Sequence, residues 1–366
     1  MVKEFIMQMR PWFDESEKEA LVDLMDNETF LTEFRHTEKF EEALKGFTNA
    51  KHCILVNNGT ISLTIAAYAL GIGHGDEVIV PNYTMVATPN SVKLLGATPV
   101  FVDVEKETLC INFEELKSKI SDKTKALMLV SANGRYPSYG IEKLKAFCNQ
   151  NNIFIIEDSA QSLGSYYPDG THIGLKGDIG SFSFSMPKII TTGQGGALVT
   201  NNDELASKIR KIKDFGRSGG GNDIHDSIGF NFKFTEMQAV IGIAQMKKLN
   251  FRIARKKEIY KRFQENLLSV DSISFFNHDF ANTAPWFIDC FVEDRDGLQE
   301  FLKKNNIGSR VMYPPLNQQQ AYNLPGNFPV SFEVGQKGLW LPSMAQLSNE
   351  EIDYITNLIK DYYERP

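Results

Sequence analysis

Short apolar runs alternate with helical patterns between about residue 50 and residue 250. Several of the apolar runs are continuous, which is typical of strands that are buried on both faces, as in a parallel sheet. Segments with helical spacing separate most of them, so this part of the chain predicts an α/β domain whose central sheet is mostly parallel and flanked by helices. The predicted strands are HCILVNN, DEVIVP, TPVFVDV, KALMLVS, IFIIEDS, IGSFSFS and GGALVT.

The C-terminal third of the chain has a different pattern. From Glu236 to Leu268 the spacing predicts one long helix, and the residues after it carry weaker strand signals and a closing helical pattern, NEEIDYITNLIKDYYE. We therefore expect two domains. The larger α/β domain covers residues 1–250, with the N-terminal segment 1–30 included, and a smaller C-terminal α+β domain covers residues 251–366.

Composition and charge exclude several classes of protein. The formal net charge of −7 argues against a nucleic-acid-binding surface, and the basic run at 252–262 is interrupted by apolar residues at the spacing of a solvated helix face. No window approaches the roughly 18 apolar residues of a membrane span, and no export signal stands at the N-terminus. Four scattered cysteines without a CxxC pair favour neither a metal site nor a disulfide framework. We expect a cytoplasmic protein.

One segment has the pattern of a phosphate site. In LVNNGTISLTIAAYALG an apolar strand ends at two asparagines, and a helix must begin near Thr60. The free N–H groups at a helix N-terminus attract a phosphate, which could sit against Gly59 and Thr60. The alternative is that Thr60 or Asn58 only caps the helix.

Two further strands end in residues with reactive side chains. IFIIEDSAQSLG places Asp158 at the end of a buried strand, where ligands of α/β sheets lie, although Asp158 could instead cap the next helix. SFSFSMPKIITTGQGGALVT places Lys188 in a tight loop after another strand. Burial near a strand end lowers the pKa of a lysine and frees its amine for a Schiff base, although a surface lysine is the commoner case.

These motifs together resemble the DegT family of sugar-nucleotide aminotransferases, which are fold-type I pyridoxal-phosphate enzymes. The resemblance runs from end to end of the chain. It is carried by NNGTISLTIAAYALGIGHGDEVIVPNYTMVAT, IIEDSAQSLGS, SFSFSMPKIITTGQGGALVT and GFNFKFTEMQAVIGIAQM, and in the C-terminal part by VMYPPLNQQQAY and LPSMAQLSNEEIDYI. The resemblance implies pyridoxal 5′-phosphate as the cofactor.

The resemblance also implies roles for individual residues. Lys188 matches the Schiff-base lysine, which also moves protons, and Asp158 matches the acid that pairs with the pyridine nitrogen. Gln161 matches a contact to the phenolic oxygen of the cofactor. The matches to the phosphate-binding positions are Gly59, Thr60 and Ser183, together with Asn231, which in the family reaches across from the partner subunit of a homodimer with shared active sites.

The sequence departs from the family pattern in three motifs. The aromatic residue over the cofactor is replaced by Met85, with Tyr83 two residues earlier as the alternative. SANGRYPSYG lacks the family's histidine, whose place Arg135 or Asn133 could take. The usual acidic residue of the glycine turn is Gln194.

The substrate side is implied by SRVMYPPLNQQQAY. Arg310, Tyr313 and Asn317 fall near the substrate in relatives, although many of these have histidine where Asn317 stands. The alternative for Arg310 is a salt bridge within the small domain.

The resemblance implies transfer of an amino group from L-glutamate to a keto group of a nucleotide-linked sugar, a 4-keto-6-deoxy or related hexose. The use would be amino-sugar synthesis for O-antigen, lipopolysaccharide or a related glycan. The alternatives are a non-nucleotide keto-sugar or carbocycle as acceptor, the dehydratase branch, which replaces the lysine, and a non-catalytic cofactor-binding regulatory protein. The sequence leaves open the nucleotide and whether C3 or C4 is aminated.

Overall fold

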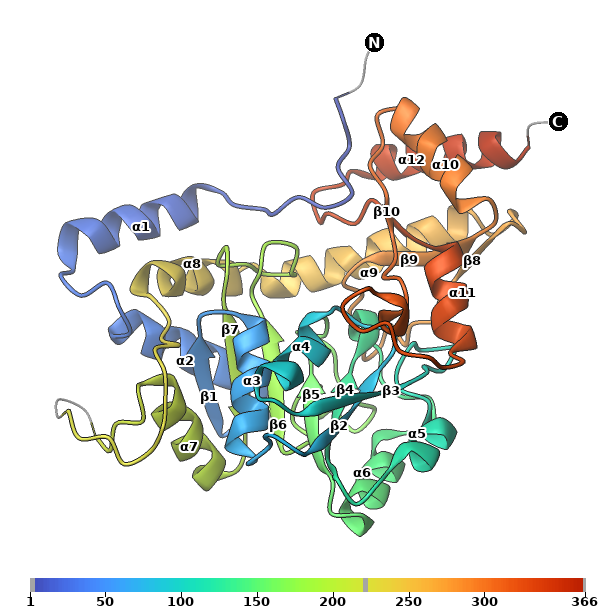
Figure 1. The fold of residues 1–366 in the computed structure, drawn as a ribbon. Coiled ribbons are helices and arrows are strands. Elements are labelled where there is room, and N and C mark those ends of the chain that lie inside the picture. The colour runs from blue at the N-terminus through green and yellow to red at the C-terminus, as the bar shows by residue number, and fades with distance from the viewer. Residues whose placement is uncertain (1–3, 220–222, 365–366) are drawn as a thin grey trace.

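The larger sheet has a strand at each of the seven positions that the sequence predicts. The computed structural model describes residues 4–219 and 223–364, and within them the strands pair in the order β1-β7-β6-β5-β4-β2-β3 (Figure 1). The predicted fold class is confirmed. The strands are β1 (His52–Val56), β2 (Glu77–Pro81), β3 (Thr98–Val102), β4 (Thr124–Val130), β5 (Phe154–Asp158), β6 (Ile179–Ser183) and β7 (Gly196–Thr200).

The strand directions bring several carboxyl ends to one edge of the sheet. Neighbours from β3 to β6 are all parallel, whereas β7 is antiparallel to both β6 and β1. In the register between β5 and β6, Asp158 lies opposite Ser181. Side chains that follow β4, β5 and β6 therefore meet at the edge where α/β sheets bind their ligands.

Helices cover both faces of this sheet, because its strands are apolar on both sides. On one face α3, α4 and α7 pack on the strands, and on the other α2 and α8 cover β1 and β7 while α5 and α6 cover the middle strands. The helices are α2 (Arg35–Thr48), α3 (Gly59–Ala69), α4 (Ala87–Leu94), α5 (Phe113–Lys119), α6 (Ile141–Gln150), α7 (Asp203–Lys213) and α8 (Glu236–Met246), with a 3-10 turn η1 (Ala132–Gly134) after β4.

The C-terminal residues build a second, smaller sheet in the order β10-β11-β9-β8, with antiparallel pairs throughout. Its core is a separate cluster that includes apolar residues of α9, α10 and α12. The elements are α9 (Leu249–Asn266), β8 (Ile273–Phe275), β9 (Ile288–Val292), α10 (Arg295–Lys304), β10 (Arg310–Val311), η2 (Leu316–Gln318), α11 (Pro329–Lys337), β11 (Gly338–Leu341) and α12 (Asn349–Tyr363).

The single long helix predicted from Glu236 to Leu268 is wrong, because the structure divides it into α8 and α9. The break falls at Lys247 and Lys248, where the Lys248 N–H bonds to the Gln245 carbonyl at 3.0 Å in a tighter turn. The Lys248 ammonium forms ion pairs with Asp14 and Glu17 at 2.6 and 2.7 Å. Contacts with the N-terminal segment, which helical spacing cannot encode, therefore accompany the break.

The N-terminal segment contacts both parts of the molecule. Helix α1 (Glu15–Asn27) packs on α8, but the residues before it cross to the smaller sheet (Figure 1). Ile6 belongs to the core of the smaller part and pairs with Ile307, and the Gln8 amide donates to the Leu341 carbonyl. Residues 6–8 thus contact the smaller part of the molecule, while the division into domains 1–250 and 251–366 stays a prediction. Within the described part of the chain, no helix has the length and apolar character to span a membrane.

Candidate active site

Asp158 ends β5 as a buried carboxyl group with few partners. The Thr88 hydroxyl, on α4, donates to its Oδ2 at 2.7 Å, and the Ala160 N–H donates to its Oδ1 at 3.3 Å. Burial raises the pKa of Asp158, against the effects of the Thr88 hydrogen bond and the nearby positive charge of Lys188. A buried carboxylate with unused lone pairs is suited to pair with a cationic ligand atom.

Lys188 lies in the loop between β6 and β7, and this loop is held from two sides. The Trp286 indole N–H donates to the Pro187 carbonyl at 2.7 Å, and the Arg252 guanidinium, on α9, donates to the Ile189 carbonyl at 3.0 Å. Burial lowers the pKa of Lys188 to about 8, although the Asp158 charge opposes this effect. A large share of the amine is therefore neutral slightly above neutral pH, as nucleophilic attack requires.

The N-terminus of α3 lies against the end of β6. Asn58 is the cap residue, and its side chain accepts the Ile61 N–H at 2.9 Å, so capping falls to Asn58 rather than to Thr60. A Cβ atom at Gly59 would stand 2.8 Å from the Ser183 Cβ, so glycine permits this approach. The arrangement brings Gly59, Thr60 and Ser183 into one neighbourhood and leaves the first N–H groups of the helix available to an anion.

A small cavity joins these elements. Gln161, Ser183 and Lys188 line it together with Ser159, Ala160 and Trp286. The Gln161 side-chain oxygen accepts the backbone N–H of Asn133 at 2.7 Å, which fixes the orientation of the amide. Three residues that the sequence predicted from two separate motifs are thus brought to one site.

Arg135, predicted as a substrate contact, does not reach this cavity. Its guanidinium is 2% exposed and forms a bidentate pair with Asp289 at 3.2 and 2.7 Å. It also donates to the Thr108 carbonyl at 2.9 Å. The role of Arg135 toward a substrate stays a prediction, but these hydrogen bonds join the β4 loop to β9. Sequence could not reveal this, because Asp289 lies 154 positions away.

Asn133, the alternative to Arg135, is also committed to the protein. Its side-chain oxygen accepts the backbone N–H groups of Trp286 and Phe287, both at 2.7 Å, and its amide donates to the Phe287 carbonyl at 2.9 Å. Asn133 thereby anchors the start of β9, while its backbone orients Gln161.

Asn317, also predicted to face the substrate, is buried and structural. Its side-chain oxygen accepts from the Asn82 amide at 2.9 Å, its N–H donates to the Asn82 oxygen at 2.8 Å, and its amide donates to the Leu324 carbonyl at 3.1 Å. These bonds attach η2 to the end of β2 and engage the side chain within the protein, while a contact of Asn317 with the substrate stays a prediction.

Arg310 and Tyr313 differ from these two residues. Arg310 is exposed, and its guanidinium lies 5.5 Å from the centre of the Trp340 ring. Among the described residues it forms no ion pair, so the alternative of a salt bridge is not realised. Burial raises the pKa of Tyr313 to about 12, while the charge of Arg310 acts to lower it and that of Asp158 to raise it. Both residues stay predicted substrate contacts.

The two candidates for the cofactor-covering residue differ in exposure. Tyr83 is 5% exposed and packs its ring 5.9 Å from that of Tyr313, whereas Met85 is 46% exposed. That Met85 covers the cofactor stays a prediction. Asn231 is exposed in the segment between α7 and α8, and its role in a partner's site also stays a prediction. The Gln194 carbonyl accepts from the Gln238 amide at 2.6 Å.

Sequence reasoning missed two residues of this site. Thr88 stands three positions after Met85, but nothing local indicates that its hydroxyl meets a carboxyl group 70 positions away. Trp286 lies almost a hundred positions after Lys188, yet its ring centre is 4.2 Å from the Lys188 Nζ. Thr88 ends the first quoted motif, which assigned it no role, and Trp286 lies outside the quoted motifs, so only the tertiary structure shows what they contact.

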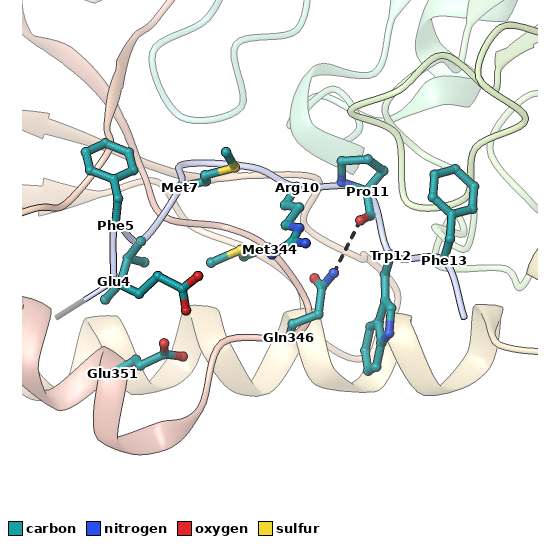
Figure 2. Close-up of a pocket in the computed structure, with 11 residues that line it drawn as sticks. Glu4, Phe5, Met7, Arg10, Pro11, Trp12, Phe13, Met344, Gln346 and Glu351 are labelled. Carbon is teal, nitrogen blue, oxygen red and sulfur yellow. Dashed lines mark hydrogen bonds between the residues drawn. The ribbon is translucent and has the colours of Figure 1, made fainter. Parts of the chain in front are cut away.

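A larger surface groove lies apart from these residues (Figure 2). It runs between the N-terminal segment and the chain near α12, where the Gln346 amide approaches the Pro11 carbonyl at 3.5 Å. Apolar and acidic side chains mix along it, including Met7, Met344 and Glu351. None of the predicted site residues lines this groove.

The sequence profile of the DegT/DnrJ/EryC1/StrS aminotransferase family matches residues 11–360. The chain belongs to this family. It is 34% identical to a GDP-perosamine synthase from Vibrio cholerae, over 96% of this chain and 98% of the relative. Its fold is similar to that of a family aminotransferase from Brucella abortus, with 29% identity, a TM-score of 0.88 and 96% of each chain covered.

A third similar protein is S. venezuelae DesV, whose structure was solved in complex with a ketimine intermediate. The TM-score is 0.90 at 26% identity, and the match covers 98% of this chain and 99% of DesV. This chain is therefore a pyridoxal-phosphate-dependent aminotransferase of the DegT/DnrJ/EryC1/StrS family, as the sequence motifs predicted.

The residues present fit this cofactor. The helix start at Gly59, where a Cβ would collide with Ser183, suits the phosphate of the cofactor. The buried Asp158 suits a protonated ring nitrogen, and the amine of Lys188 suits a carbonyl carbon. When bound, pyridoxal phosphate supplies the carbonyl carbon for amine exchange and a ring that withdraws electrons. These individual assignments remain proposals.

Proposed function

We propose that this aminotransferase moves the amino group of L-glutamate to a keto group of a nucleotide-linked deoxysugar. The observation that carries the proposal is the 34% identity to GDP-perosamine synthases over nearly the full length of both chains. The relatives' names point to a GDP-linked sugar, so the first acceptor to test is a GDP-linked 4-keto-6-deoxyhexose. The product would enter O-antigen or a related glycan, and we expect the reaction to take place in the cytoplasm.

The proposal assigns a task to each of two residues. The Lys188 amine, with a pKa lowered to about 8 by burial, would hold the cofactor covalently and would move a proton at the substrate carbon. The Asp158 carboxylate would pair with the protonated ring nitrogen, and the Thr88 hydrogen bond keeps Asp158 in one orientation.

The proposed active form is a homodimer with shared active sites, in which Asn231 of one subunit reaches the phosphate site of the other. Arg310 and Tyr313 are the proposed contacts to the sugar or to glutamate. Arg310 is exposed and free of ion pairs among the described residues, and the Tyr313 ring packs 5.9 Å from that of Tyr83. A carbocyclic or non-nucleotide acceptor and a non-catalytic regulatory role are the alternatives, and the intact Lys188 argues against the latter and against a dehydratase.

Two measurements, made one after the other, test the proposal. Addition of L-glutamate to the purified enzyme should convert the visible absorbance of the lysine-bound cofactor to that of the pyridoxamine form. A panel of GDP-, dTDP- and UDP-linked keto-sugars, with 3-keto and 4-keto members, should then show one acceptor whose mass changes by replacement of a keto oxygen with an amine.

Controls separate the possible failures. Lys188→Ala should abolish both responses, whereas Lys18→Ala, at an exposed residue of α1, should change neither. A response to glutamate without any aminated sugar would contradict the proposed acceptor but not the aminotransferase reaction. Turnover by Lys188→Ala at the wild-type rate would contradict the assignment of the lysine.

A further inference from the structure

Trp286 presents its ring to the amine of Lys188. The Nζ atom lies 4.2 Å from the ring centre, well inside the distance of about 6 Å at which an aromatic face attracts a cation. The indole is buried, with 4% exposure, so water screens this attraction only weakly. The ring therefore favours the ammonium form, whereas the burial of Lys188 favours the neutral amine.

The position of the ring is fixed at four points. Its indole N–H donates to the Pro187 carbonyl in the lysine loop at 2.7 Å, and its backbone N–H donates to the Asn133 side chain at 2.7 Å. Its carbonyl accepts from the Lys256 Nζ, on α9, at 2.6 Å, and its ring stacks on that of Phe287 with centres 3.8 Å apart. A side chain held by the lysine loop, the β4 loop and α9 can move little.

We propose that Trp286 is a positioning residue that receives the Lys188 ammonium whenever this amine is not bonded to the cofactor. The reaction must release the lysine so that the substrate amine can take its place, and a released lysine has a long, flexible stem. A fixed aromatic face keeps the amine beside the reaction centre and holds its proton for return to the substrate. The inference rests on the proposed role of Lys188 but not on the identity of the acceptor.

The test measures the pKa of the released amine. In enzyme loaded with pyridoxamine 5′-phosphate, Lys188 is free, and cyanate modifies only its neutral form. The rate of carbamylation at Lys188, followed by peptide mass spectrometry from pH 6 to 10, gives the pKa directly. We expect a midpoint near 8 for the wild type and a midpoint about one pH unit lower for Trp286→Leu, which lacks an aromatic face.

Trp286→Phe distinguishes the effect of the aromatic ring from that of the indole hydrogen bond. Because phenylalanine keeps an aromatic face but cannot donate to Pro187, its midpoint should stay within a few tenths of a unit of the wild type. Trp340→Phe is the matched control, since Trp340 is a buried tryptophan that touches Trp286, with ring centres 5.8 Å apart, but not Lys188. Exposed Lys18 serves as the internal reference for the cyanate reaction.

A second measurement uses fluorinated tryptophan at position 286, which preserves the fold even if the leucine variant does not fold. Fluorinated tryptophans have nearly the same shape as tryptophan, but each added fluorine weakens the negative potential of the ring face. Of the three tryptophans, only Trp286 faces Lys188, so progressive fluorination should lower the Lys188 midpoint in steps. A midpoint that stays constant through the fluorination series, or one that rises in Trp286→Leu, would overturn the proposal. Either result is independent of whether a sugar is aminated.

Discussion

At the scale of single residues, partners that are distant along the chain decide what each polar side chain can do. Asp158 and Lys188 keep few protein partners and remain free for a ligand, whereas Arg135 and Asn317 are engaged in hydrogen bonds that attach loops to strands. All four are polar residues in loops or at strand ends. Their difference lies in whether the fold supplies a partner that satisfies them.

Thr88 is predicted to control the pKa of Asp158 and its contact with the cofactor. Thr88→Val removes the hydroxyl that donates to the carboxylate at 2.7 Å, so the pKa of Asp158 should rise further and its contact with the ring nitrogen should weaken. We expect cofactor affinity and kcat to fall by roughly tenfold or more, because a hydrogen bond to a charged group is worth about 1.5–3 kcal/mol. Thr88→Ser, which keeps the hydroxyl, should retain most of both, and equal losses in the two variants would refute the role.

Gly59 is predicted to be required for its small size. In Gly59→Ala the new Cβ would meet the Ser183 Cβ at 2.8 Å, which should displace the helix start and weaken cofactor binding about tenfold, as measured by absorbance titration. The same substitution made in a Ser183→Gly background should weaken cofactor binding much less, because the Ser183 Cβ that the new atom would meet is absent.

The matched control for this prediction is Gly46→Ala on α2. No atom lies within 4 Å of a Cβ at this position, so alanine should leave cofactor binding unchanged and stabilise the helix by roughly 0.5–1 kcal/mol. If Gly59→Ala bound the cofactor as tightly as Gly46→Ala, the close approach of α3 to β6 would have no functional importance.

At the scale of elements, α9 connects the two sheets and touches the lysine loop. Its Arg252 holds the Ile189 carbonyl, and its Lys256 holds the carbonyls of Trp286 and Ser343. Lys256 is 1% exposed, and its two acceptors match the two N–H groups of a neutral amine. Burial therefore lowers the pKa of Lys256 to about 7, with a smaller contribution from the charge of Arg252.

This buried lysine should make the stability of the fold depend on pH. Between about pH 7 and 10.5 the unfolded chain carries a proton on Lys256 that the folded chain lacks. The free energy of unfolding should therefore rise with pH in this window, with Lys256 contributing up to about 1.4 kcal/mol per unit. Urea unfolding at pH 7, 8 and 9 should give a smaller slope for Lys256→Met than for the wild type. Equal slopes would show that Lys256 stays charged in the folded protein.

At the scale of the whole molecule, one chain alone does not bring all of the predicted phosphate contacts together. Gly59, Thr60 and Ser183 gather at the end of β6, but Asn231 lies exposed in the segment between α7 and α8. The prediction that Asn231 acts in a neighbouring subunit accounts for its exposure. A closed two-fold dimer would complete two sites at once.

Mixing two inactive variants tests this arrangement. Lys188→Ala and Asn231→Ala homodimers should each be weak, but a heterodimer has one site with both residues intact. Random reassociation of equal amounts makes about half of the dimers heterodimers, so about a quarter of all sites should regain wild-type function. Activity of the mixture that merely equals the mean of the two variants would show that Asn231 does not act across a subunit interface.

Local sequence was sufficient for the element types and the fold class, while the roles of Asp158 and Lys188 at their strand ends stay predictions. The seven strands of the larger sheet follow from continuous apolar runs. These inferences succeed because burial and secondary structure depend on patterns within about ten residues. The division of the predicted long helix at Lys247 was missed because residues near the N-terminus pair with Lys248 there.

Only the tertiary structure decided which polar residues are free. Thr88 meets Asp158, Trp286 meets Lys188, and Arg135 meets Asp289 across separations of 70 residues or more. A hydrogen bond or an aromatic contact acts over a few ångströms in space, but the order of residues along the chain does not record that distance. The sequence by itself therefore determined the fold class and the cofactor, and it predicted the role of Lys188. The packing of the two sheets through α9 determined what holds this lysine in place.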